Sequence, residues 1–200
     1  NRWLKPYGLW FPVDVSTAAQ CTIGGMAGNN SCGSRSIKYG NMVHNVLGID
    51  ALLADGSQGH FGLTSNLPDN ERIRAIVQQV QHIAERENAN IMESFPKVLR
   101  RVGGYNLDIF NCQNSRPYNL DGQVNLAHLL VGSEGTLGLT QRIKLQLAPL
   151  PVHKVLAVVN FAQFYQAMDL TQHIVTLKPS AVELVDRTMI NLARDIPMFK

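Results

Sequence analysis

Apolar and polar residues recur with regular periods along the chain, and these periods predict its first elements. A nearly continuous apolar run from Asn45 to Ala54, closed by Asp55-Gly56, is typical of a buried strand and its turn. Phe61 to Leu63 is predicted to form the returning strand. From Pro68 onward we predict an amphipathic helix of about four turns, because apolar residues recur at the spacing of one helix face, at Ile73, Ile76, Val77, Val80 and Ile83.

A boundary is predicted near residue 150. Polar residues and glycine dominate residues 100–121 and indicate a loop, and the apolar run 126–131 then leads into a Gly-rich turn. Another apolar element is predicted over residues 138–147. Pro149-Leu150-Pro151 ends it, because proline lacks a backbone donor and fixes φ.

Beyond this boundary the pattern predicts a fresh β-α unit. Val152 to Phe161 is predicted to be a strand, and the following helix carries on one face Phe164, Ala167, Met168, Thr171, Ile174 and Val175. A partner strand is predicted at Ala181 to Val185, and Asp186 is predicted to cap a helix that reaches Ile196. A β-α-β start without completion, together with the missing initiator methionine, indicates a piece of a longer protein.

Composition excludes several classes of protein. The 200 residues are 45% hydrophobic and 16% charged, as in an ordinary globular chain. The net charge of +3 comes from scattered Lys and Arg, so no nucleic-acid partner is expected. The odd number of cysteines (Cys21, Cys32, Cys112) favours neither disulfides nor zinc and fits a reducing compartment. Six dispersed histidines predict no metal site, and no apolar stretch approaches the roughly 20 residues of a membrane span.

The first Gly-rich segment runs from Thr22 to Gly33. Its glycines let the backbone turn and approach a ligand, offering N–H groups to an anion such as pyrophosphate. It is neither a G-x-G-x-x-G fingerprint nor a phosphate-binding loop closed by Lys-Ser or Lys-Thr. Composition alone fits a surface loop equally well.

The second Gly-rich segment runs from Gly132 to Gly138 and carries one acid, Glu134. An acid beside backbone that packs tightly is suited to holding ribose hydroxyls or neighbouring amides. The same acid fits the N-terminus of a helix, which is the commoner role for a lone acid in a turn.

Several motifs in a fixed order carry a family resemblance. The chain resembles the FAD-linked oxidases of the vanillyl-alcohol-oxidase superfamily, in the branch of D-lactate, glycolate and D-2-hydroxyglutarate dehydrogenases. The motifs are Phe11-Pro12-Val13-Asp14, Thr22-Ile23-Gly24-Gly25, Asn29-Asn30-Ser31-Cys32-Gly33, Tyr39-Gly40, Asn45-Val46-Leu47-Gly48, Gly104-Tyr105-Asn106-Leu107, Gly132-Ser133-Glu134-Gly135-Thr136-Leu137-Gly138 and Glu183-Leu184-Val185-Asp186.

The resemblance implies an α+β fold in two parts. Residues 1–150 would be the second subdomain of a PCMH-type FAD-binding domain, a mainly antiparallel sheet flanked by helices. A helical and loop insertion would occupy about residues 66–121. Residues 151–200 would begin an α/β substrate (cap) domain.

The resemblance also assigns cofactor contacts. The segments along the flavin and its pyrophosphate would supply Pro12, Asp14, Thr22, Ile23, Gly24 and Gly25, with Asn29, Ser31 and Gly33 continuing that wall. Val46 would meet the adenine through its main chain, and Glu134, Gly138 and Leu139 would approach the ribose or ring. Arg101 would face the substrate, although an exposed loop arginine explains it as well.

The implied activity is oxidation of a D-2-hydroxy acid to the 2-oxo acid, with FAD passing electrons to a quinone or cytochrome-type acceptor. The catalytic residues would lie beyond Lys200, and half of the FAD cradle before Asn1, so the fragment alone is expected to be inactive. FAD is expected in the intact protein, and whether the fragment alone binds it stays open. Large multidomain members also carry an iron–sulfur domain. The intact protein is expected to be cytoplasmic, or peripheral to the inner membrane.

Two alternatives stay open. One is another branch of the superfamily, such as an alkyl-glycerone-phosphate synthase or an alditol oxidase. The Glu183-Leu184-Val185-Asp186 signature and the long insertion argue against this branch. The other is a flavin-free structural or partner-binding module, which the sequence does not distinguish from a fragment without its cofactor.

Overall fold

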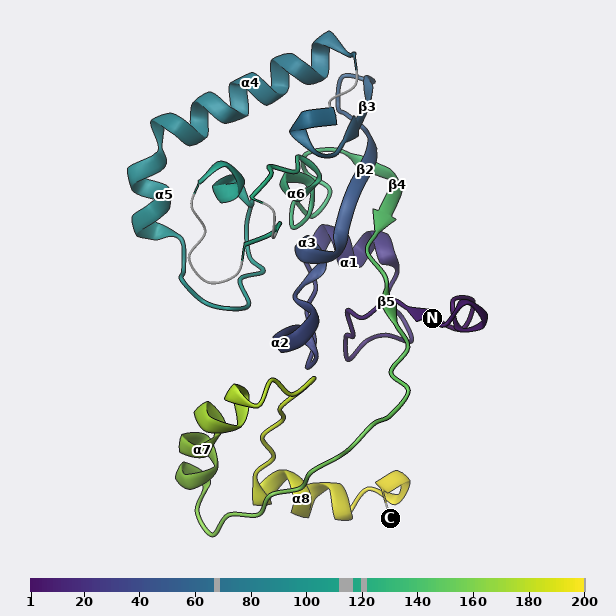
Figure 1. Cartoon of the computed structure of the whole chain (residues 1–200), viewed down its shortest axis with the longest axis vertical. Helices are drawn as coiled ribbons and strands as arrows, with labels where there is room; N and C mark the ends of the chain where they lie inside the picture. Colours follow the sequence, from purple (N-terminus) through teal and green to yellow (C-terminus); the bar gives the residue numbers. More distant parts are fainter. Residues whose placement is uncertain (67–68, 112–116, 120–121, 200) are drawn as a thin grey trace.

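The computed structural model describes residues 1–66, 69–111, 117–119 and 122–199 (Figure 1). It combines short helices with antiparallel strands, which confirms the predicted α+β class. Cys112, one of the three cysteines weighed above, lies outside the described residues. Among the described residues, no helix has both the length and the apolar character needed to cross a membrane.

The strand β2 (Val46–Leu52) is the centre of the main sheet. Two antiparallel neighbours, β3 (Gln58–Phe61) and β4 (Leu139–Leu145), flank it. The predicted buried strand is therefore confirmed. The returning strand begins earlier than Phe61, because the turn after β2 already places Gln58 opposite Leu52.

A second, two-stranded sheet joins the two ends of this region. It pairs β1 (Leu9–Trp10) with β5 (Ala148–Pro149) in antiparallel register. The indole Nε1 of Trp10 donates a hydrogen bond to the Pro149 carbonyl at 3.1 Å. This contact ties the start of the chain to the segment that follows β4.

The helix α4 (Glu71–Arg86) confirms the predicted amphipathic helix. Asn70 caps it, since its side-chain oxygen accepts a hydrogen bond from the Ile73 amide at 3.1 Å. Its buried face carries Ile73, Val77 and Ala84. Gly59 on β3 leaves room for this face, because a Cβ there would lie 2.4 Å from Ile73 Cδ1.

The remaining helices of residues 1–150 are short. They are α1 (Ile23–Asn29), α2 (Ser36–Tyr39), α3 (Met42–Asn45), α5 (Asn88–Ser94) and α6 (Ala127–Leu130), with the 3-10 turns η1 (Lys5–Tyr7), η2 (Thr64–Asn66) and η3 (Leu107–Phe110). The core lies where α3, α4 and α6 meet β2. Its most deeply buried side chains include Met42, Val43, Ile49, Ile73 and Leu126.

Residues 151–199 form helices but no strands. The two predicted helices are confirmed as α7 (Phe164–Thr176) and α8 (Arg187–Arg194), followed by η4 (Pro197–Phe199). Asp186 caps α8 as predicted, accepting from the Met189 amide at 2.7 Å. Figure 1 shows α7 and α8 apart from the main sheet, joined to it by an extended segment.

The predicted strands at 152–161 and 181–185 are wrong for this structure, because neither segment has strand pairing. A strand requires a neighbour that satisfies its N–H and C=O groups, and the described residues offer none here. The side chain of Val155 is consequently 94% exposed. An apolar run alone did not suffice to form a strand.

Candidate cofactor-binding site

The first Gly-rich segment, Thr22–Gly33, is largely helical, whereas the sequence indicated a turn. Thr22 caps α1, its Oγ1 accepting from the Gly25 amide at 3.0 Å. Residues 22–25 are exposed, and a Cβ built on Gly24 would meet nothing within 4 Å. The first amides of a helix have no intrahelical acceptor, so this open turn presents N–H groups to solvent or to a ligand.

The end of α1 is held by a buried asparagine that the sequence reasoning did not assign to the site. Asn30 adopts the left-handed conformation, with φ of 51°, and is fully buried. Its Oδ1 accepts from the Val43 amide at 3.0 Å, and its Nδ2 donates to the Arg101 carbonyl at 3.3 Å. The motif Asn29-Asn30 before a small residue is the signal that could have marked it, because asparagine tolerates this conformation.

The two Gly-rich segments meet at this point. The Gly132 amide donates to the Ala27 carbonyl at 2.9 Å, and the Glu134 amide donates to the Gly28 carbonyl at 3.0 Å. Residues more than 100 positions apart in the chain therefore form one continuous surface. Glu134 has a φ of 51° and lies in a turn, so the alternative of a helix N-terminus is wrong.

Three of the predicted contact residues come together on this surface. The Glu134 Oε1 accepts a hydrogen bond from Asn29 Nδ2 at 3.1 Å, and Ser31 Oγ donates to Asn29 Oδ1 at 3.1 Å. Asn29 and Glu134 are exposed, and Ser31 is partly exposed. We name the surface made by exposed residues 22–25, Asn29 and 134–137 the motif wall.

Pro12, Asp14 and Gly33 form a second group. Pro12 is fully buried. The Asp14 carboxylate accepts from the Arg35 amide at 3.2 Å and from Ser34 Oγ at 3.1 Å, and it pairs with the Arg35 side chain at 3.6 Å. A Cβ on Gly33 would lie 1.4 Å from the Asp14 carbonyl oxygen, so close packing against Asp14 requires this glycine.

Val46 and Leu139 lie at opposite ends of the β2–β4 ladder. Val46 pairs with Leu145, while Leu139 pairs with Leu52. Six residues of strand separate the two positions by about 20 Å. Val46 is buried, and its carbonyl already accepts a hydrogen bond from His128 Nε2 at 3.1 Å.

Gly138 and Leu139 begin β4, beside the motif wall. A Cβ on Gly138 would lie 3.1 Å from the Leu52 carbonyl oxygen, so this glycine allows β4 to approach β2 closely. The side chain of Leu139 is 65% exposed. Their predicted contact with the ribose or ring stays a prediction.

Arg101 is held inside the predicted insertion rather than exposed on a loop. Its side chain is 13% exposed and pairs with Asp108 at 2.6 Å. The guanidinium also lies 4.7 Å from the centre of the Phe95 ring and contacts the Tyr118 hydroxyl. Burial and the neighbouring Asp108 carboxylate raise the pKa of Tyr118 above its ordinary value. The exposed-loop alternative is therefore wrong, and facing the substrate stays a prediction.

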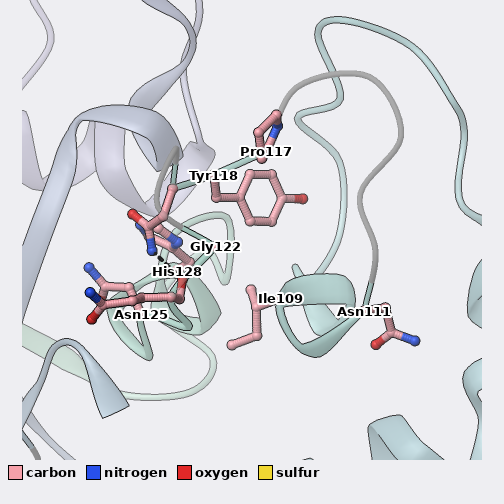
Figure 2. Close-up of a pocket in the computed structure, with 9 residues that line it drawn as sticks. Ile109, Asn111, Pro117, Tyr118, Gly122, Asn125 and His128 are labelled. Atoms are coloured by element: carbon pink, nitrogen blue, oxygen red, sulfur yellow. Dashed lines mark hydrogen bonds between the residues drawn. The ribbon is translucent and has the colours of Figure 1, made fainter. Parts of the chain in front are cut away.

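A separate cavity of about 260 Å³ opens next to His128 (Figure 2). The side chains that line it include Ile109, Asn111, Tyr118, Asn125 and His128. Burial lowers the pKa of His128 to about 4, and its Nε2–H donates to the Val46 carbonyl. None of the predicted cofactor contacts lines this cavity, so it is not the candidate site.

The motif wall offers chemical groups that are suited to binding FAD. Its open helix turn at residues 22–25 offers amides suited to an anionic group, and the Glu134 carboxylate offers acceptors suited to hydroxyl groups. Gly24 leaves the space that a side chain would otherwise fill. FAD contains both chemical groups, a pyrophosphate and hydroxyl-bearing sugars.

Comparison with known proteins supports FAD as the cofactor. Residues 1–62 match the family described as FAD binding domain, and residues 150–199 match the family described as FAD linked oxidases, C-terminal domain. The chain is 31% identical, over 98% of its length, to D-2-hydroxyglutarate dehydrogenase of Escherichia coli. It is 30% identical, over 96%, to the protein of the same name in Pseudomonas putida.

A further relative is "D-lactate dehydrogenase [cytochrome], mitochondrial" of Arabidopsis thaliana, with 27% identity over 95% of the chain. The chain spans 19% of the length of the Escherichia coli and Pseudomonas putida relatives and 24% of the Arabidopsis protein. The two family matches follow each other along the chain in the same order as the two predicted units, which supports the resemblance to the FAD-linked oxidases.

Proposed function

We propose that the protein containing this chain is an FAD-dependent dehydrogenase that oxidises a D-2-hydroxy acid to the corresponding 2-oxo acid. The observation that carries the proposal is the motif wall, where the Glu134 amide bonds to the Gly28 carbonyl and the Glu134 carboxylate to Asn29. Two segments with the family's motifs thereby form a single surface. The names of the similar proteins support the choice of a hydroxy-acid substrate.

Within this proposal, residues of the chain bind and orient the cofactor. The open amides at Ile23 and Gly24 would face the pyrophosphate, and Glu134 would accept hydrogen bonds from sugar hydroxyls. Asn29 holds the Glu134 carboxylate in position, and Ser31 holds Asn29. Asp14 and Gly33 fix the turn that follows α1.

FAD supplies the two-electron oxidant for the α-carbon of the hydroxy acid. A base that takes the hydroxyl proton is expected outside these 200 residues. Arg101 has its charge balanced by Asp108, so it would reach a substrate carboxylate only by exchanging that partner. We therefore assign the chain a role in cofactor binding rather than in the chemical step.

The preferred substrate is D-2-hydroxyglutarate, ahead of D-lactate and glycolate. Relatives named D-2-hydroxyglutarate dehydrogenase are 29% to 31% identical, with 31% in Escherichia coli and 29% in Haemophilus influenzae. A relative named "Glycolate oxidase subunit GlcD" from Bacillus subtilis is 24% identical. Electrons would leave through a quinone or cytochrome-type acceptor, by way of an iron–sulfur domain if the intact protein carries one, at the cytoplasmic side of the inner membrane.

The test is a visible absorption spectrum of the purified full-length protein, followed by anaerobic addition of D-2-hydroxyglutarate or D-lactate. Oxidised flavin gives bands near about 370 and 450 nm, and the proposal expects D-2-hydroxyglutarate to bleach the latter. Bleaching by D-lactate alone would change the substrate and keep the enzyme class. A colourless protein that takes up no added FAD would support the flavin-free module instead.

A further inference from the structure

The predicted insertion contributes a tyrosine to the edge of the motif wall. The Gly103–Tyr105 turn lies against the second Gly-rich segment, since a Cβ on Gly132 would lie 3.2 Å from the Gly104 carbonyl oxygen. The Tyr105 hydroxyl lies 2.8 Å from Thr136 Oγ1. The Tyr105 side chain remains 49% exposed, so a ligand on the wall can reach it.

The direction of this hydrogen bond follows from the groups involved. Thr136 Oγ1 donates its single hydrogen to the Ser133 carbonyl at 2.6 Å, and a carbonyl oxygen only accepts. Thr136 therefore has no hydrogen left for Tyr105. The Tyr105 hydroxyl donates to Thr136, and its own oxygen presents only lone pairs to the outside.

The groups next to Tyr105 on the motif wall are also hydrogen-bond acceptors. Glu134 lies two residues before Thr136 in the same turn and is an acceptor, with Oε1 engaged by Asn29. Asn29 Oδ1 accepts from Ser31. Among the described residues, no Lys or Arg forms an ion pair with Glu134. This end of the wall therefore repels a phosphate and attracts a group that donates hydrogen bonds.

We propose that the Tyr105 oxygen accepts a hydrogen bond from a sugar hydroxyl of FAD, on its ribityl chain or its ribose, and that Tyr105 is a cofactor-binding residue. The inference rests on the proposed function. It adds to that function a binding residue from the insertion, beside Glu134 on the motif wall.

The experiment measures FAD affinity in the full-length protein after removal of bound flavin. Tyr105→Phe removes the accepting oxygen and keeps the ring. Loss of one hydrogen bond between neutral groups weakens FAD binding by roughly tenfold. The matched control is Tyr7→Phe, another exposed tyrosine, which packs at a tilted angle against Trp3 and is expected to leave FAD affinity unchanged.

A second variant separates orientation from the accepting oxygen. Thr136→Val removes the partner that orients the phenol but leaves its oxygen, so we expect a smaller loss of FAD affinity than in Tyr105→Phe. FMN distinguishes the two hydroxyl sources, because it keeps the ribityl chain and lacks the adenosine ribose. A loss for both FMN and FAD assigns the ribityl chain, whereas a loss for FAD alone assigns the ribose.

Unchanged FAD affinity in Tyr105→Phe, with the parent protein binding FAD, would overturn this inference and leave the proposed function standing. A parent protein that binds no FAD would overturn both. The thermal midpoint of the flavin-free Tyr105→Phe protein is expected to match that of its parent.

Discussion

Residues 1–150 and residues 151–199 carry similar apolar patterns and reach different structures. Both contain amphipathic helices with an aspartate or asparagine cap, α4 with Asn70 and α8 with Asp186. The helix α4 buries Ile73 completely, whereas none of the described residues 151–198 is buried. An apolar period is therefore sufficient to form a helix in both regions. Burial of its apolar face requires in addition another part of the protein against which the helix packs.

The two regions differ more in their strands than in their helices. Residues 46–52 pair on both sides, with β3 and β4, and form the centre of the sheet. Residues 152–161 are equally apolar and remain unpaired, with Leu156 88% exposed. A helix satisfies its own backbone groups, but a strand depends on a neighbour, so only the strand is lost when the neighbour is missing.

The largest expected effect is a difference in the free energy of unfolding between substitutions in the two regions. Ile73→Ala removes buried contacts against Gly59 and is expected to lower the free energy of unfolding by about 2–5 kcal/mol. Ile190→Ala on α8, where the side chain is 45% exposed, is expected to change it by less than about 0.5 kcal/mol. Urea unfolding of the full-length protein, followed by hydrogen exchange of β2 amides, measures both. Equal losses in the two variants would show that α8 is packed as firmly as α4.

A pH effect is expected in the first region, from His128. Burial lowers the pKa of His128 to about 4 in the folded protein, against 6.5 as its ordinary value. The unfolded chain therefore binds this proton at higher pH, so stability is present above pH 6.5 and is lost as pH falls towards 4. The loss is on the order of 3 kcal/mol.

The substitution His128→Gln keeps a donor for the Val46 carbonyl and removes the titration. Its unfolding free energy is expected to depend less on pH between 6.5 and 4 than that of the parent. His153→Gln, at an exposed position in the second region, is the matched control and should follow the parent. If His128→Gln also follows the parent, His128 does not cause the acid sensitivity.

The smallest expected effect concerns the cap of α8. Asp186→Ala removes the acceptor for the Met189 amide and is expected to destabilise the helix by about 1 kcal/mol. Because no described residue of this region is buried, the loss should remain local. Faster hydrogen exchange at Met189 with unchanged exchange in β2 is the expected result. Faster exchange in β2 as well would reveal coupling between the regions.

The sequence by itself determined several local elements and the family resemblance. The spacing of Ile73, Val77 and their neighbours was sufficient for α4, the cap at Asp186 for the start of α8, and the Gly-Ser-Glu-Gly string for the resemblance. These features depend on residues within one or two turns of each other. Local propensity and periodicity express such short-range effects directly.

Only the tertiary structure decided which of these segments contact each other. It brought Glu134 to Asn29, buried Asn30 beneath Arg101, and placed Val46 and Leu139 at opposite ends of one ladder. It also left residues 152–161 without a strand partner. Each outcome depends on hydrogen-bond partners far away in the chain, and no period in the local sequence records where such a partner will lie.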